Sequence, residues 1–480
     1  MKFGTSGLRG LVSDMTNPVC EDYATAFIAH LCRGDLAPAA LLIGRDLRPS
    51  SPRIAAACRA ASRRAGVPAI DCGVLPTPAL ALESTFRNLP AIMVTGSHIP
   101  FDRNGLKFYR TDGVEIAKAD EAGILAALDR PVAAVASIAP ETADRGARDR
   151  YVLRALDFFS HTALRGRRVG VWQHSAAGRD ILVEILEGLG ATVVALGRSE
   201  TFVAIDTEAV SAEHVAQARA WTDAYDLDAL ATTDGDGDRP LLADESGRWL
   251  RGDVLGLVAA SALGADAVAT PISSNTALER CGRFARVLRT RIGSPYVIEA
   301  LETLVAEGAR LPVGFEANGG FLLAGAAMGE NGRRLAPLPT RDAVLPIVVA
   351  LVAAAQREAP LSTLLEGLPP RVTASDRLQD IPPERSAALL GSLRDDPAAL
   401  AAFAADAFGV ISVEAVDVTD GVRLQLPGDE IAHLRASGNA PELRCYAEAE
   451  SSDRAAALVA RALATSAARL RVTRRDPRSP

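Results

Sequence analysis

A serine in a tight loop and three alternating carboxylates are the residues of this chain best suited to chemistry. Ser97 lies in the segment Thr-Gly-Ser-His-Ile-Pro at 95–100, directly after an apolar run. Asp234, Asp236 and Asp238 are separated by single glycines. A serine hydroxyl can carry a phosphoryl group, and carboxylates can hold the Mg²⁺ that neutralises charge during phosphoryl transfer. The two segments together predict an enzyme that moves phosphate onto and off Ser97.

The acidic loop has two other interpretations, a calcium loop of the EF-hand kind and a solvated turn. Glu245 does stand at the twelfth position from Asp234, but Arg239 stands at the sixth, where an EF-hand loop needs glycine. Residues 227–231 form a short apolar run, and 244–247 are typical of a hairpin turn. Carboxylates without a nearby histidine or cysteine favour a hard cation over zinc. We therefore expect a catalytic metal loop between two strands.

The serine loop is expected at the end of a buried strand over 90–95. Open α/β sheets bind ligands outside the carboxyl ends of their strands, so Ser97 and the adjacent His98 would face a ligand. Asn104-Gly105 favours a hairpin turn, after which Lys107 on a strand over 106–109 would lie near the same loop. Each residue alone is also compatible with an ordinary turn or surface role. Their occurrence beside a metal loop favours a site.

A third segment near the C-terminus is suited to phosphate binding. Arg435 offers a guanidinium fork, Ser437 and Asn439 offer side-chain donors, and Gly438 exposes backbone N–H groups. This set fits a phosphate monoester. The alternative is an ordinary loop between two strands of a small domain.

A strand–helix–strand unit recurs along the chain and must position these loops. The first copy runs over 41–70, the second over 169–194, and a weaker third over 267–288. Repeated units of this kind predict three related α/β domains with mixed sheets. The segment after 368 differs in character and ends in an amphipathic helix over 454–470, which predicts a smaller α+β domain.

Composition excludes several other classes of protein. The formal net charge of −7 argues against a nucleic-acid-binding surface. The longest apolar run, 343–355, contains a proline and is shorter than the ~20 residues that a membrane span needs. The six cysteines are scattered without a Cys-x-x-Cys pair, which fits free thiols in a reducing compartment. With no signal-peptide pattern at the start, we expect a cytoplasmic protein without a membrane partner.

These motifs resemble, in kind and in order, those of the α-D-phosphohexomutase superfamily, and the resemblance runs through most of the chain. The matching segments are 3–10, 44–50, the phosphoserine loop at Ser97, the metal loop at 234–239, the sugar-recognition loop at 314–320 and the phosphate clamp at 435–439. The resemblance implies that Arg9 reaches the active site, and that Arg239, Glu316 and Asn318 bind substrate.

The resemblance also implies a four-domain architecture around a central cleft. We expect domains over 1–148, 149–252, 253–367 and 368–480, which contribute in turn the phosphoserine, the metal loop, the sugar loop and the clamp. Mg²⁺ on Asp234, Asp236 and Asp238 would also touch Ser97. Arg9, His98 and Lys107 would stabilise the transferred group or move protons.

The chain differs from the superfamily's usual motif sequences at four positions. Gly96 and Ile99 replace residues of the more common Thr-Ala-Ser-His-Asn-Pro, and Asn318 replaces a serine. Gly320 stands where some members have a histidine, which leaves the identity of one acid/base group open.

The sequences of these motifs together are most similar to those of bacterial phosphomannomutases. This predicts interconversion of mannose 6-phosphate and mannose 1-phosphate, with hexose 1,6-bisphosphate as intermediate and activator. Phosphoglucomutase, dual-specificity and phosphoglucosamine mutase activities remain alternatives. A more remote one is a magnesium-dependent sugar-phosphate phosphatase. The oligomeric state stays open.

Overall fold

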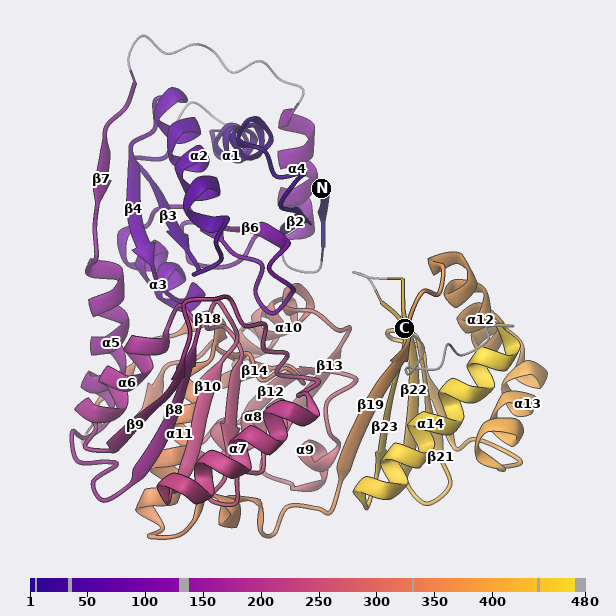
Figure 1. Cartoon of the computed structure of the whole chain (residues 1–480). Helices are drawn as coiled ribbons and strands as arrows, with labels where there is room; N and C mark the ends of the chain where they lie inside the picture. Colours follow the sequence, from indigo (N-terminus) through magenta and orange to yellow (C-terminus); the bar gives the residue numbers. More distant parts are fainter. Residues whose placement is uncertain (5–6, 33–36, 129–137, 330–331, 438–440, 471–480) are drawn as a thin grey trace. The chain divides into compact units, whose positions relative to one another are not determined.

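The structure, a computed structural model, describes residues 1–4, 7–32, 37–128, 138–329, 332–437 and 441–470 (Figure 1). The chain divides into two compact units. Unit 1 comprises Met1–Ala269, Phe284–Leu288 and Gly293–Glu366. Unit 2 comprises Thr270–Arg283, Arg289–Ile292 and the chain from Gly367 onward.

The first sheet contains seven strands in the order β1-β2-β6-β5-β3-β4-β7. Its parallel centre, β5-β3-β4-β7, continues into antiparallel β6, β2 and β1. Prolines in the first turns of α1, α2 and α3 favour helix initiation at those points. The elements are β1 (Lys2–Phe3), β2 (Leu8–Leu11), α1 (Asn17–Leu31), β3 (Leu41–Arg45), α2 (Ser51–Arg64), β4 (Ala69–Val74), α3 (Thr77–Arg87), β5 (Ala91–Val94), β6 (Arg103–Tyr109), α4 (Lys118–Leu128) and β7 (Glu141–Ala143).

The second sheet has the order β11-β10-β8-β9, parallel except for the β10–β11 pair. Its elements are α5 (Gly146–Phe158), β8 (Arg168–His174), α6 (Arg179–Gly188), β9 (Thr192–Arg198), α7 (Ala212–Tyr225), β10 (Ala229–Thr233) and β11 (Pro240–Ala243).

The third sheet has the order β13-β12-β14-β15-β18, and β16 and β17 form a separate two-stranded sheet. Its β12–β14 pair is parallel, whereas β14–β15 and β15–β18 are antiparallel. The elements are α8 (Gly252–Leu263), β12 (Ala267–Pro271), α9 (Ala277–Arg280), β13 (Arg286–Thr290), α10 (Ser294–Ala306), β14 (Pro312–Phe315), β15 (Phe321–Leu323), β16 (Ala327–Met328), β17 (Arg334–Leu335), β18 (Leu338–Asp342), α11 (Val344–Gln356) and the 3-10 helix η2 (Leu361–Leu365).

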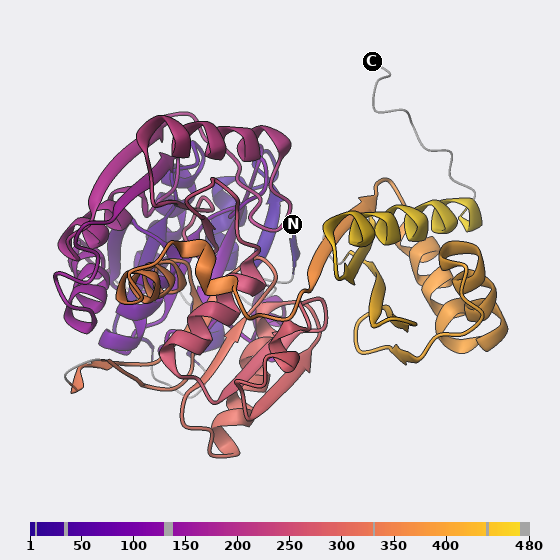
Figure 2. The same cartoon turned by 90° about the horizontal axis from the view of Figure 1, so that it is seen from below.

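The last sheet, in unit 2, is antiparallel in the order β19-β23-β22-β21-β20. The yellow helix α14 packs against β19 and β23 of this unit (Figure 2). Its elements are β19 (Val372–Leu378), α12 (Pro383–Asp395), α13 (Pro397–Phe408), β20 (Ala415–Asp417), β21 (Val422–Leu426), β22 (Glu430–Ala436), β23 (Leu443–Ala449) and α14 (Ser452–Arg469).

Each unit has apolar clusters of its own. In unit 1 a single cluster runs from Leu42 through Leu182 to Leu351, so it joins elements of all three α/β segments. In unit 2 a second cluster includes Phe403, Leu434 and Leu458. The predicted fold class, three mixed α/β sheets followed by an α+β domain, is confirmed.

One local prediction is wrong. Asn104-Gly105 does not form a hairpin turn, because both residues lie inside β6 and pair with Gly10 and Arg9 of β2. The Asn104 side chain is buried and donates to the Ser50 and Ser51 hydroxyls, so a tertiary contact outweighs the local turn preference.

Within the described chain, no helix is both long and apolar enough to cross a membrane.

Candidate active site

Ser97 sits in a strained turn directly after β5. Its φ of 54° places a non-glycine residue in the left-handed region. Its backbone N–H donates to Thr95 Oγ1 at 2.8 Å, and the Thr95 hydroxyl in turn donates to Asp46 Oδ2 at 2.7 Å. The turn points the Ser97 side chain toward the acidic loop, where Ser97 Oγ donates to Asp234 Oδ2 at 2.5 Å. The two predicted halves of the site therefore meet.

Arg48, a fully buried residue, stabilises the serine loop through hydrogen bonds to its backbone. Its Nη2 donates to the carbonyl oxygens of Ser97, at 2.8 Å, and of Ile99. Its Nη1 donates to the carbonyl oxygens of Pro100 at 2.6 Å and Arg103 at 3.0 Å. A Cβ at position 96 would lie 2.5 Å from the guanidinium carbon, so the unusual glycine there allows this close approach.

The acidic loop joins β10 to β11 and brings its three carboxylates together. One oxygen from each of Asp234, Asp236 and Asp238 lies within 4.8 Å of the others, and all three side chains are buried. Asp234 Oδ1 accepts from the backbone N–H groups of Asp238 and Arg239, which closes the loop. Burial, together with the charges of Asp236 and Asp238, raises the pKa of Asp234 well above its usual value.

The carboxylate oxygens divide into two sets. Asp236 Oδ2 accepts from Thr77 Oγ1 at 2.7 Å and from Lys107 Nζ at 2.6 Å. Asp238 Oδ2 accepts from Lys107 Nζ at 2.5 Å and from Arg341 Nη2 at 2.8 Å. Among the described residues, the buried Asp236 Oδ1 and Asp238 Oδ1 accept no hydrogen bond. Buried carboxylate oxygens without donors fit an oxygen-binding divalent cation, so this donor set suits Mg²⁺.

His98 of the serine loop and Arg239 of the acidic loop lie close together. Arg239 Nη1 lies 2.9 Å from His98 Nδ1. A guanidinium can only donate, so Nδ1 is the acceptor and the ring proton is on Nε2. Burial, with the nearby charges of Arg239 and Arg9, lowers the pKa of His98 well below its usual value. The imidazole is therefore neutral at pH 7. Arg9 Nη1 donates to Gly96 O at 2.6 Å, which brings Arg9 to the same loop.

The sugar loop predicted from the sequence connects β14 to β15. Glu316 and Asn318 are both buried, and Arg341 Nη1 lies 3.5 Å from Glu316 Oε1. Asn318 Oδ1 accepts from the Gly320 N–H at 3.0 Å, so its oxygen shapes the loop. Its amide NH₂ is therefore the group to consider for a sugar hydroxyl.

The predicted clamp lies in unit 2. Arg435, in β22, donates from Nε to Asp420 Oδ2 at 2.9 Å, and the Ser437 N–H donates to Glu442 O at 2.9 Å. Gly438 and Asn439 lie outside the described residues.

Comparison with known proteins agrees with this arrangement. Domain models of the phosphoglucomutase/phosphomannomutase family match 1–133 (domain I), 149–247 (domain II), 251–372 (domain III) and 384–465 (C-terminal domain). Two curated relatives named phosphomannomutase, from Sinorhizobium fredii and Salmonella muenchen, are each 47% identical. Each alignment covers 96% of this chain, and 98% and 94% of the respective relatives.

This chain belongs to the phosphoglucomutase/phosphomannomutase family.

The four-domain architecture and the assignment as a phosphohexomutase enzyme are thereby confirmed. A solved family protein from Burkholderia thailandensis has the same fold, with a TM-score of 0.76, 21% identity and 97% coverage of both chains. A solved N-acetylphosphoglucosamine mutase from Aspergillus fumigatus, with a TM-score of 0.56, 14% identity and coverage of 97% of this chain and 95% of that chain, was determined in complex with GlcNAc-6P and magnesium.

Three residues of this phosphohexomutase contact the site but had no role assigned from sequence. Arg48 lies in the segment 44–50, which resembles a family motif, yet nothing local indicates that it wraps the serine loop. Thr77 begins α3, and Arg341 lies in β18, more than a hundred residues after the metal loop. Only the tertiary structure brings them together, so no spacing in the sequence could have found Thr77 or Arg341.

Proposed function

We propose that this enzyme is a phosphomannomutase that interconverts mannose 6-phosphate and mannose 1-phosphate through a phosphorylated Ser97. The observation that carries the proposal is the hydrogen bond from Ser97 Oγ to Asp234 Oδ2, at 2.5 Å. Asp234 lies in the acidic loop, whose other buried carboxylates are suited to Mg²⁺. The 47% identity to two proteins named phosphomannomutase supports mannose as the sugar.

The proposed reaction has two phosphoryl transfers. Phosphoserine-97 gives its phosphoryl group to the free hydroxyl of the bound hexose phosphate, and a hexose 1,6-bisphosphate forms. The bisphosphate then reorients in the site, and its other phosphoryl group is transferred to Ser97. Mg²⁺ held by Asp234, Asp236 and Asp238 would neutralise charge on the transferred group.

The chain's own residues would bind substrate and move protons. Arg9 and Arg239 supply positive charge beside the serine loop, and neutral His98 can hold a proton on Nε2. Lys107 fixes Asp236 and Asp238 and adds a further cation. Glu316 and the Asn318 amide would bind sugar hydroxyls, and the clamp at 435–439 would bind the phosphate that is not reacting.

Glucose phosphate is the closest alternative substrate, because it differs from mannose phosphate at one hydroxyl. If Glu316 and Asn318 bind hydroxyls that both sugars share, discrimination is weak. Glucosamine phosphate is a further alternative. The six free cysteines support a reducing, cytoplasmic location as part of the proposal.

The test is a coupled assay with Mg²⁺ and a trace of hexose 1,6-bisphosphate on mannose, glucose and glucosamine 1-phosphates. We expect the highest kcat/KM with mannose 1-phosphate and a loss of at least ~10³-fold in Ser97→Ala, because a covalent nucleophile is removed. Normal turnover by Ser97→Ala would refute the covalent scheme. A preference for glucose or glucosamine ester would change the sugar assignment, and stoichiometric phosphate release would favour the phosphatase.

A further inference from the structure

Arg341 is a buried cation whose two ends contact two different functional loops. Its Nε and Nη2 donate to Asp238 Oδ2 at 3.1 and 2.8 Å, and its Nη1 lies 3.5 Å from Glu316 Oε1. Its side chain is about 5% exposed. Asp238 belongs to the metal loop and Glu316 to the sugar loop, so one planar guanidinium joins the two.

Gly320 provides the space that this side chain occupies. A Cβ on Gly320 would lie 2.6 Å from Cδ and 2.8 Å from Cγ of Arg341, both closer than real Cβ contacts permit. Gly320 does not have a positive φ, so its backbone does not itself require glycine. The absence of a side chain at 320 therefore fits the path of Arg341, not a turn.

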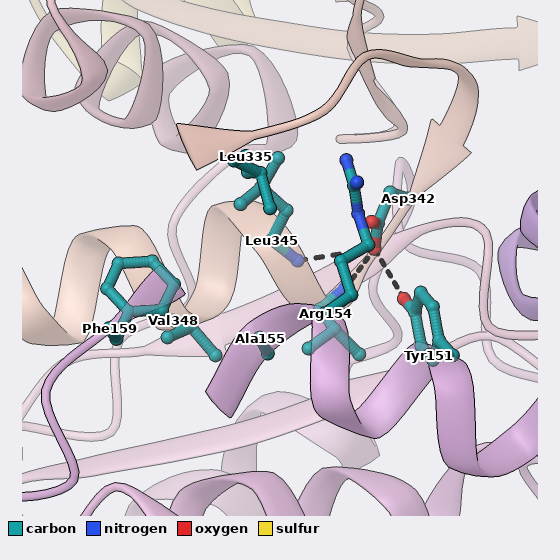
Figure 3. Close-up of a pocket in the computed structure, with 9 residues that line it drawn as sticks. Tyr151, Arg154, Ala155, Phe159, Leu335, Asp342, Leu345 and Val348 are labelled. Carbon is teal, nitrogen blue, oxygen red and sulfur yellow. Dashed lines mark hydrogen bonds between the residues drawn. The ribbon is translucent and has the colours of Figure 1, made fainter. Parts of the chain in front are cut away.

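The strand that carries Arg341 is fixed on its opposite face. Successive strand residues point to opposite sides, so Asp342 faces away from the metal loop. Asp342 Oδ1 accepts from the Tyr151 hydroxyl at 2.6 Å and from the N–H groups of Val344 and Leu345 at 2.9 and 3.2 Å (Figure 3). These bonds anchor the end of β18 to α5 and to the start of α11, which limits how far Arg341 can move.

We propose that Arg341 is a positioning residue that couples the metal loop to the sugar loop, by orienting Asp238 and Glu316 together. The inference rests on the proposed function for the roles of those two carboxylates. A change in Glu316 is transmitted through the guanidinium to Asp238 and so alters cation binding, although Glu316 is not a metal ligand. A guanidinium does not give up its proton, so Arg341 does not replace the acid/base histidine that Gly320 lacks.

The test is a double-mutant cycle read by Mg²⁺ binding. Calorimetry on metal-stripped, unphosphorylated full-length enzyme gives the Mg²⁺ dissociation constant of wild type, Glu316→Gln, Arg341→Met and the double variant. We expect Glu316→Gln to change that constant by at least about threefold in wild type and to leave it unchanged beside Arg341→Met. Equal effects in both backgrounds would overturn the proposal.

Two further variants separate geometry from charge. Arg341→Lys keeps the charge but lacks the two-ended fork, so the coupling should be lost, and retained coupling would reject the geometric role. Gly320→Ala should displace Arg341 and also abolish the coupling while retaining the arginine, which decides the question if Arg341→Met does not fold.

The matched control is Tyr151→Phe, which removes a bond from the other face of β18. It should lower thermal stability but keep the coupling; loss of coupling there would show that any weakening of the strand suffices. Because these readouts are binding constants for Mg²⁺ alone, they stand apart from the assay of sugar preference. An enzyme that failed that assay could still show the coupling.

Discussion

At the scale of single residues, Arg48 illustrates how a side chain outside the reaction can determine the geometry of the nucleophile. It donates to three backbone carbonyl oxygens of the serine loop and to that of Arg103 at the start of β6, and its Nε lies 3.3 Å from Asp46 Oδ2. Its guanidinium also lies over the Phe202 ring, 4.0 Å from the centroid. The positive φ of Ser97 persists because this network supports the turn.

We therefore expect Arg48→Lys to reduce kcat by at least ~10-fold, since one ammonium group cannot replace the fork that donates to these carbonyls. Arg179→Lys is the matched control, because Arg179 is also buried and donates to the backbone carbonyls of His174 and Ser199. Both variants should lose thermal stability, but only Arg48→Lys should lose turnover by folded enzyme. Equal losses of kcat would contradict a specific role for Arg48.

At the scale of elements, β2 and β6 show why a local signal failed. Gly105 looks like a turn glycine, yet a Cβ there would lie 2.4 Å from Leu8 O and 3.0 Å from Thr95 O. The glycine serves a close approach of backbones within the sheet, not a turn.

Gly105→Ala should accordingly destabilise the protein by roughly 1–3 kcal/mol, as overpacking against fixed backbone does. Gly391→Ala is the opposite case, because Gly391 lies inside α12 with nothing within 4 Å of the added Cβ. That variant should be stabilised by about 0.5–1 kcal/mol from helix propensity. Shifts of the unfolding midpoint in urea measure both, and a neutral Gly105→Ala would refute the backbone contact.

The elements also show what sequence could and could not predict. Short apolar runs and turn residues in the sequence indicate the strand before Ser97 and the two strands that flank 234–238. The prediction that Ser97 and the three aspartates lie in loops at the ends of these strands is therefore confirmed. The sequence predicts that Asn318 binds substrate, because an amide can bond a sugar hydroxyl. It does not predict that the Asn318 side-chain oxygen accepts a hydrogen bond from the Gly320 N–H, which depends on the folded loop. Arg341 depends on the pairing of β18 with β15, which is a property of the folded sheet.

At the scale of the whole molecule, each unit has its own apolar core and contains a buried histidine that is far from the proposed phosphoserine in the sequence. Burial lowers the pKa of His174 in unit 1 and of His433 in unit 2 to about 4. His433 faces Asp420, Arg423 and Arg435, and its Nε2 lies 2.5 Å from Asp420 O.

These histidines should make the protein less stable in mild acid. An unfolded histidine takes up a proton near pH 6.5, whereas the folded ones do so only near pH 4. The unfolded state thus binds more protons in this window, and stability falls as the pH is lowered through it.

His433→Gln should remove roughly 1–2 kcal/mol of the stability difference between pH 7 and pH 5. Gln can still donate to Asp420 O but does not titrate. Urea unfolding of both proteins at the two pH values measures the effect, and an unchanged pH dependence would show that the pKa of His433 does not differ between the folded and unfolded states.

The contacts around the acidic loop also constrain when the site can come into existence during synthesis. Asp234 and Asp236 contact Ser97, Thr77 and Lys107, all of which leave the ribosome earlier, while the second cation on Asp238 comes from Arg341, which leaves about a hundred residues later. A nascent chain that ends between them carries clustered carboxylates whose charge is only partly compensated. The positively charged partners of the acidic loop are thus complete only once β18 has been synthesised, and a fragment over 149–252 contains neither Lys107 nor Arg341.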